Sequence, residues 1–139
     1  MRHPVNRAAI LLLPLWLVGC GGGPSGGISF TDDPGTAAQP FPFNYRTDLL
    51  AFLRSYLNNP VGVRDAAMAP PAQRTVGGRL RYVICVNYTA MDGDGKPLAP
   101  QQLAVSFVDA RLDRVVEDTA AACAGASYAP FPEMEKMTR

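Results

Sequence analysis

The side chains of this chain that are best suited to covalent chemistry are those of its three cysteines. The first of them, Cys20, has a distinctive position in the sequence. It directly follows Gly19, at the end of an apolar stretch that occupies residues 8–18. A cysteine thiolate is a strong nucleophile and can form a thioether bond. Cys20 is the only strongly nucleophilic side chain of this region, so it is the residue best suited to covalent modification.

Residues 1–19 have the organisation of a secretory signal peptide. Arg2, His3 and Arg7 precede the apolar stretch without any acidic residue, which holds this end on the cytoplasmic side during export. As a helix, the apolar stretch would extend about 16 Å, roughly half of a hydrocarbon layer of about 30 Å. Pro14 also interrupts it. The segment is therefore predicted to be a signal and not a permanent membrane span.

The run Leu17-Val18-Gly19-Cys20 resembles the lipobox of bacterial lipoproteins. The resemblance implies that the mature chain begins at Cys20 and carries acyl chains such as palmitate there. Two or more acyl chains hold a protein stably on a membrane. Because Gly21 and not an aspartate follows, the resemblance also implies the periplasmic face of the outer membrane rather than the inner membrane. The alternative is an ordinary signal peptide followed by a chance cysteine.

Composition predicts one folded domain behind this anchor. Residues 20–43 are rich in glycine and proline and read as the lipidated N-terminus and a flexible tether, and residues 44–139 form a small domain. Phe41 and Phe43, at the end of the tether, are expected to fold back onto the domain. So short a chain buries only a small core, which excludes a second domain.

Removal of residues 1–19 changes the charge and the chemistry. The full chain has 13 Lys and Arg against 12 Asp and Glu, and losing Arg2 and Arg7 leaves 11 against 12, a charge of −1. This balance gives no electrostatic reason to bind nucleic acid or anionic lipid head groups. His3, the only histidine, is lost as well. We expect no cofactor and no metal in the mature chain.

Cys85 and Cys123 remain, and in an envelope compartment they are predicted to form a disulfide. Closing the 38-residue loop between them would stabilise the fold by roughly 4 kcal/mol. Two buried free thiols are one alternative. A metal site is another, but two sulfurs without histidine complete a zinc tetrahedron only with carboxylates.

Periodicity predicts one helix followed by antiparallel strands. The helix, of about 13 residues, begins at a cap on Asn44 or Thr47 and ends at Asn58-Asn59-Pro60. Its apolar face is expected to cover a sheet rather than to bind a ligand. The residues of that face recur at steps of three and four: Tyr45, Leu49, Phe52, Leu53, Tyr56 and Leu57.

The clearest strand is Leu80–Thr89, apolar on both faces and therefore central. A turn at residues 91–97 joins it to Gln102–Val108, and Leu112–Val116 should add a third strand. The weaker candidates are a short strand at residues 61–68 that ends before Pro70-Pro71, a helical turn at residues 119–123 that returns Cys123 to Cys85, and an extended tail around residues 128–132.

The predicted fold class is thus α+β, with one N-terminal helix packed on a three- to four-stranded antiparallel sheet and one disulfide. The run Arg81-Tyr82-Val83-Ile84-Cys85-Val86, with the ending at residues 123–133, resembles small lipoproteins of alpha-proteobacteria over residues 45–135. That resemblance implies a compartment and a shape, and no activity or binding residue.

Three sets of residues could support chemistry in this domain. Asp92-Gly93-Asp94-Gly95 resembles the start of a calcium loop, but Leu103 or Ala104 stands where the closing glutamate belongs, so a hairpin turn explains it better. Acid–base hydrolysis could use Asp109 with Asp113, or Glu117 with Asp118. A serine nucleophile would need Lys96 or Lys136 as its base. The candidate serines are Ser55, Ser106 and Ser127.

A surface for a partner protein is the remaining candidate. Arg81, Tyr82 and Tyr88 belong to the residue types favoured at interface hot spots, although packing beneath the helix is the plainer use of the tyrosines. The sequence predicts a membrane-anchored cell-envelope lipoprotein that is not an enzyme and serves as an accessory or protein-binding module. The alternative is a small envelope hydrolase that uses a carboxylate pair.

Overall fold

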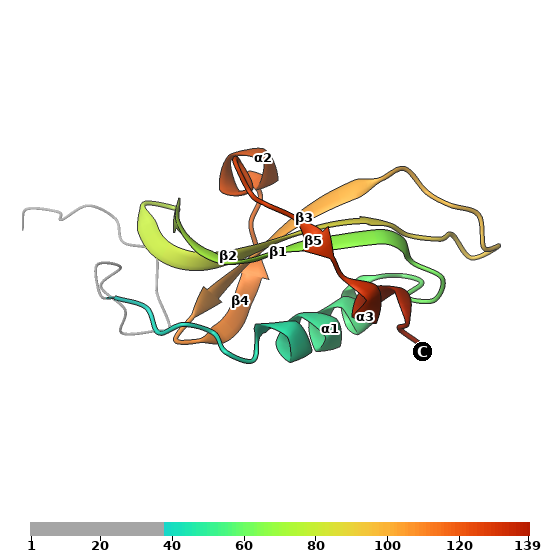
Figure 1. Ribbon diagram of the computed structural model, residues 1–139, viewed down its shortest axis with the longest axis horizontal. Helices are drawn as coiled ribbons and strands as arrows, with labels where there is room; N and C mark the ends of the chain where they lie inside the picture. Colours follow the sequence, from blue (N-terminus) through green and yellow to red (C-terminus); the bar gives the residue numbers. More distant parts are fainter. Residues whose placement is uncertain (1–37) are drawn as a thin grey trace, which may run out of the picture. The chain divides into compact units, whose positions relative to one another are not determined.

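The computed structural model describes residues 38–139, which form one helix-covered antiparallel sheet (Figure 1). The predicted signal peptide, the lipid attachment at Cys20 and most of the tether lie outside the described residues. The sheet has five strands in the order β4-β3-β2-β1-β5, where three or four were predicted. The elements along the chain are α1 (Tyr45–Tyr56), β1 (Arg64–Val76), β2 (Arg79–Thr89), β3 (Gln101–Val108), β4 (Arg111–Val115), α2 (Thr119–Ala122), β5 (Ala129–Pro130) and α3 (Pro132–Glu135).

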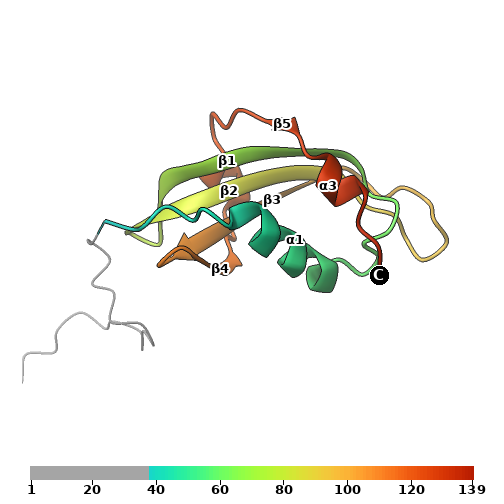
Figure 2. The ribbon, with the colours of Figure 1, turned by 60° about the horizontal axis from the view of Figure 1, so that its bottom comes forward.

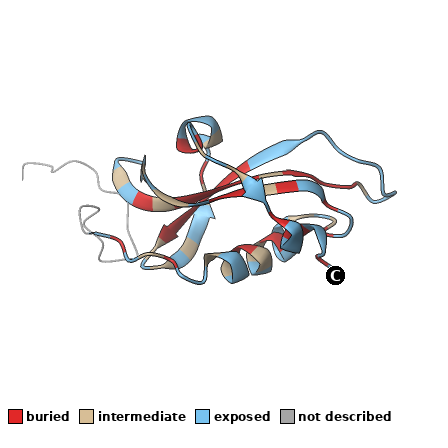
Figure 3. Ribbon diagram, in the orientation of Figure 1, coloured by how far each residue is buried: buried red, intermediate tan, exposed pale blue. Residues whose placement is uncertain are grey.

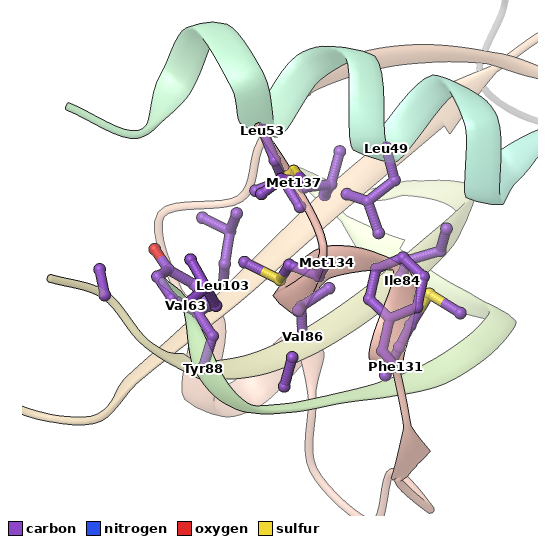
Figure 4. Close-up of a cluster of buried hydrophobic side chains, with 14 of the residues drawn as sticks. Leu49, Leu53, Val63, Ile84, Val86, Tyr88, Leu103, Phe131, Met134 and Met137 are labelled. Atoms are coloured by element: carbon purple, nitrogen blue, oxygen red, sulfur yellow. The ribbon is translucent and has the colours of Figure 1, made fainter. Parts of the chain in front are cut away.

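Most of the central strand β2 is buried (Figure 3). It separates two clusters of apolar side chains, as its two-sided apolar pattern predicted. Ile84 and Val86 point to one side and are covered by Leu49 and Leu53 of α1 (Figure 4). The odd-numbered residues of β2 point to the other side, where Cys85 lies beneath α2. The predicted arrangement of a helix on an antiparallel sheet is therefore confirmed, and a second, smaller layer completes it.

The chain from Phe131 onward packs into the main core. From the sequence, an extended tail pinned by the rings of Tyr128 and Phe131 is expected, and the structure adds the short helix α3. Phe131 and Met134 have no exposed surface, and Met137 is 3% exposed. The Phe131 N–H donates to the carbonyl oxygen of Ala66 at 2.8 Å, which fixes the short strand β5 against β1. The helix α3 was not predicted, because Pro130 and Pro132 suggest an extended chain. The apolar residues near these prolines pack into the core all the same.

Strand β1 continues through Pro70 and Pro71, so the predicted break at these residues was wrong. The register with β2 shifts between Ala69 and Ala72, and the two prolines lie within that irregularity. A bulge removes the need for ladder hydrogen bonds at the bulged residues, and proline has no N–H to donate. On its other edge, β1 pairs with β5 only at Ala67 and Met68. The pairing with β5 therefore requires no N–H donor at Pro70 or Pro71 either.

The folded region begins earlier than the predicted residue 44. Gln39 is 7% exposed and its side-chain oxygen accepts the Asp109 N–H at 3.0 Å, and Pro42 is buried. Helix α1 begins after Asn44, as predicted, but the Asn44 side chain makes no capping hydrogen bond. Residues 39–43 therefore belong to the domain and not to the tether.

Two tight turns shape the same end of the sheet. Gly77 and Gly78 join β1 to β2, and Asp109 and Ala110 join β3 to β4. All four residues have positive φ, the conformation that two-residue hairpin turns require and that matches the twist of the strands. Ala110, at φ 61°, holds this conformation without the freedom that glycine has.

Candidate functional site

The disulfide between Cys85 and Cys123 is the clearest covalent feature of the domain. Their Cα atoms lie 5.8 Å apart, and both residues are buried. Helix α2 positions Cys123, and the Asp118 carboxylate caps this helix by accepting the Ala121 N–H at 3.0 Å. The predicted helical turn and pairing are confirmed. The alternatives of two free thiols and of a metal bound to these thiols are wrong, because each sulfur is bonded to the other.

A groove of about 570 Å³ lies beside α2 on the disulfide face of the sheet. Val76 and Val116 contribute apolar walls, and charged side chains line the rest: Arg74, Arg114, Glu117 and Asp118. Most of these charges already hold the structure together. Arg74 donates to the Ala124 carbonyl oxygen at 3.1 Å, and Asp118 caps α2.

The carboxylate pairs predicted for hydrolysis are placed differently from each other. Asp109 lies in the β3–β4 turn, and Asp113 accepts a 2.8 Å hydrogen bond from the Arg114 guanidinium. Glu117 and Asp118 both line the groove. Asp118 uses one of its two carboxylate oxygens to cap α2. Two of the four carboxylates, Asp113 and Asp118, therefore have structural partners, and Glu117 lines the groove beside Asp118.

The Asp92-Gly93-Asp94-Gly95 segment forms a hairpin turn, the interpretation that sequence analysis favoured over a calcium loop. One carboxylate oxygen of Asp92 accepts the N–H groups of Asp94 and Lys96, at 2.9 and 2.8 Å. This oxygen thus stabilises the turn itself. Within residues 38–139, no three histidine, cysteine or acidic side chains gather where they could hold a metal ion.

The candidate serines are dispersed over the domain. Ser106 is 1% exposed and donates to the Arg114 carbonyl oxygen at 3.4 Å. Ser55 donates to the Phe52 carbonyl oxygen within α1 at 2.8 Å, and Ser127 is exposed after α2. The two hydroxyl groups with backbone partners serve local structure, and one of them is out of reach of a substrate.

The proposed partner residues of β2 do not share one surface. Arg81 is buried on the disulfide side, and its guanidinium donates to the Leu80 carbonyl oxygen at 3.0 Å. Tyr82 and Tyr88 lie on the α1 side, where Tyr82 is half-buried and Tyr88 is 3% exposed. The plainer interpretation of Tyr88, packing beneath the helix, fits this position.

Burial also changes the acidity of Tyr88. It raises the pKa of the phenol above 10.0, and the nearby Tyr56 phenol raises this pKa further. The Tyr88 hydroxyl donates to the side-chain oxygen of Gln101 at 3.1 Å, which satisfies it in its neutral form. Tyr88 is thus held as a neutral core residue with a polar edge.

Aromatic rings gather where the chain enters the domain, and sequence analysis predicted only part of this cluster. The Phe41 ring packs edge-on against Tyr82, with ring centroids 5.3 Å apart, and against Phe43 at 5.1 Å. Phe41 therefore folds back onto the domain as predicted. Phe43 touches Phe41 but stays 84% exposed, so for this ring the prediction of burial was wrong.

Comparison of the chain with protein-family models, curated proteins and solved structures finds no match. Among the helices of residues 38–139, none is long and apolar enough to cross a membrane. The role of the protein must therefore be inferred from this chain's own residues.

Proposed function

We propose that this protein is a cell-envelope lipoprotein, anchored through acyl chains on Cys20 and carrying residues 38–139 as a non-catalytic accessory or protein-binding module. The Cys85–Cys123 disulfide is the observation that carries the proposal. Disulfides persist in oxidising compartments such as the bacterial periplasm and are rare in the cytosol. A signal-like N-terminus that ends in Leu17-Val18-Gly19-Cys20 supplies the route to that compartment.

The arrangement of polar groups supports a binding role over catalysis. Asp92 and Asp118 hold a turn and a helix cap, and Ser106 is buried. A catalytic site needs a nucleophile and a base within reach of each other and of a substrate. A binding module needs only accessible apolar or aromatic side chains, and Phe43 and Tyr56 are exposed.

The alternative, a small envelope hydrolase, has one favourable observation, which is the groove beside Glu117. In that case Glu117→Gln would abolish cleavage of an envelope polymer by the purified protein and leave the melting temperature unchanged. The accessory role predicts that the unsubstituted protein and this variant are equally inactive.

The lipid anchor is tested by metabolic labelling with a palmitate analogue. The wild-type chain should incorporate the label and fractionate with membranes, and Cys20→Ser should do neither, because the acceptor sulfur is absent. Ser25→Ala is the matched control: it changes one residue five positions beyond Cys20, leaves the acceptor sulfur and the Cys85–Cys123 disulfide in place, and should retain the label. Equal labelling of wild type and Cys20→Ser, or no labelling of the wild type, would refute the anchor.

A further inference from the structure

Charge is distributed unevenly over the domain, although the whole chain is nearly neutral. The two stretches that contain the hairpin turns, residues 74–81 and 109–114, carry five arginines against two aspartates. Those arginines are Arg74, Arg79, Arg81, Arg111 and Arg114. By contrast, the β2–β3 connection at residues 91–98 carries two aspartates against one lysine.

Of the five arginines, Arg81 is buried. Arg74 and Arg114 lie beside the groove together with Glu117 and Asp118. The arginines next to the two turns are therefore Arg79 and Arg111, against the one acidic residue Asp109.

Both turns lie at the same end of the sheet, and the described chain begins there (Figures 1 and 2). Arg79 pairs with Val76 beside the first turn, and Arg111 pairs with Val108 beside the second. Gln39 accepts the N–H of Asp109, which brings residues 39–43 across the same strand ends. We call this region the hairpin end and define it as residues 39–43, 77–80 and 109–111.

The hairpin end also exposes apolar side chains. Phe43 is 84% exposed, and Leu80 on β2 is 38% exposed. Phe41 holds the Phe43 ring in place through an edge-on contact and itself packs on Tyr82. The fold thus fixes a large ring at its surface without covering it.

Phe43 reaches Tyr82 through Phe41 on the α1 side of the sheet. Arg79, in contrast, pairs with Val76 and leaves β2 on the disulfide side. The ring and the arginine can therefore face one membrane only if the hairpin end approaches it end-on. Aromatic and basic side chains are typical of surfaces that lie at the boundary between lipid head groups and acyl chains.

We propose that the hairpin end docks on the surface of an anionic bilayer, with Phe43 inserted among the head groups and Arg79 and Arg111 against lipid phosphates. This inference rests on the proposed lipid anchor. The described chain begins at Ala38, 18 residues after Cys20. The tether that composition predicts for this segment would have a root-mean-square span of about 20–25 Å, and on that prediction the hairpin end would stay close to the membrane that the acyl chains occupy.

Because the domain is tethered to the membrane, weak binding of the hairpin end to the bilayer is enough for docking. A short flexible connection raises the effective concentration of the linked site to the millimolar range. One inserted ring and two arginines therefore need not bind a membrane from free solution. The tether also determines which end of the sheet is nearest to the membrane. The chain enters the domain at the hairpin end, so this end is the one expected to contact the bilayer.

The test uses the lipidated chain, purified and inserted into vesicles of phosphatidylcholine with phosphatidylglycerol. Trp16 is the only tryptophan in the sequence and leaves with residues 1–19, so Phe43→Trp gives the mature chain a single tryptophan, which can be excited separately from its five tyrosines. Docking predicts that brominated lipids quench the emission of this introduced indole in these vesicles and that the emission is blue-shifted relative to detergent. Leu98→Trp, in the β2–β3 connection, is the matched control and should not be quenched.

The arginines are tested in the Phe43→Trp background. An arginine near an anionic surface contributes about fivefold to binding, so Arg79→Gln with Arg111→Gln should lower the ratio of docked to undocked protein roughly 30-fold. Vesicles of phosphatidylcholine alone should show the same loss. If bromolipid quenches neither position, docking is refuted.

The controls separate this inference from the proposed anchor. Palmitate on the purified Phe43→Trp chain, with no quenching of its indole, refutes docking and leaves the anchor intact. Absence of palmitate refutes the anchor, and with it this inference. Shielding of the indole that depends on protein concentration and not on bromolipid would assign the hairpin end to a second copy of the chain, which also refutes docking.

Discussion

Replacement of the disulfide gives the largest stability change that the structure predicts. Cys85 and Cys123 are 38 residues apart in the sequence, and opening a loop of that length releases chain entropy in the unfolded state worth about 4 kcal/mol at 25 °C. For a domain of this size, each kcal/mol corresponds to about 4–8 °C in melting temperature. The double variant Cys85→Ala with Cys123→Ala should therefore melt roughly 15–30 °C below wild type.

The assay is thermal and urea unfolding of residues 20–139 with Cys20→Ser, so that only the two paired cysteines remain. Reduction of the same protein with an excess of thiol controls for packing, because it opens the loop without removing the two sulfur atoms. The reduced protein and the double variant should lose similar stability. A loss below about 1 kcal/mol in both would refute the argument from loop entropy. A loss in the variant alone would assign the effect to packing beneath α2.

Two further predictions concern single side chains. Ala110→Gly should raise the free energy of unfolding by about 1 kcal/mol, because a non-glycine residue in this left-handed conformation costs about 1–2 kcal/mol and glycine loses part of that gain as backbone entropy; unchanged urea midpoints would contradict this. The raised pKa of Tyr88 predicts a pH effect. Its contribution is complete below pH 10 and is lost as the pH rises toward the folded-state pKa, because the unfolded chain releases its proton first. Tyr88→Phe should flatten the fall of melting temperature above pH 10, and equal slopes for both proteins would refute the assignment.

Local patterns predicted the elements whose own residues determine their burial. Strand β2 alternates apolar residues on both faces, and a strand of that kind is central in almost any antiparallel sheet. Helix α1 has Leu49 and Leu53 on one face, which requires a covering layer. The cysteine pairing followed from compartment and count, and its position beneath α2 followed from the predicted helical turn at residues 119–123, of which the structure forms α2 with Cys123 as its C-cap.

The missed elements depend on contacts between residues that are distant in the sequence. Nothing near Phe131 indicates that its N–H pairs with the Ala66 carbonyl oxygen, 65 residues earlier. Likewise, Pro70 and Pro71 suggest a break unless the bulge against β2 is known. The hairpin end was missed for the same reason. The chain's net charge conceals a local excess of arginine that forms only when two separate turns lie together.

Membrane docking and partner binding through Tyr82 make incompatible demands on the same end of the sheet. Tyr82 packs against Phe41, which in turn holds Phe43, so a protein partner that covered Tyr82 would lift the hairpin end from the bilayer. A partner that binds the Phe43→Trp protein while its indole stays quenched must instead use the opposite end, where Val61 and Leu98 are exposed. The fluorescence of this variant therefore reports on both hypotheses, because only a partner bound at the hairpin end would reverse the quenching by brominated lipid.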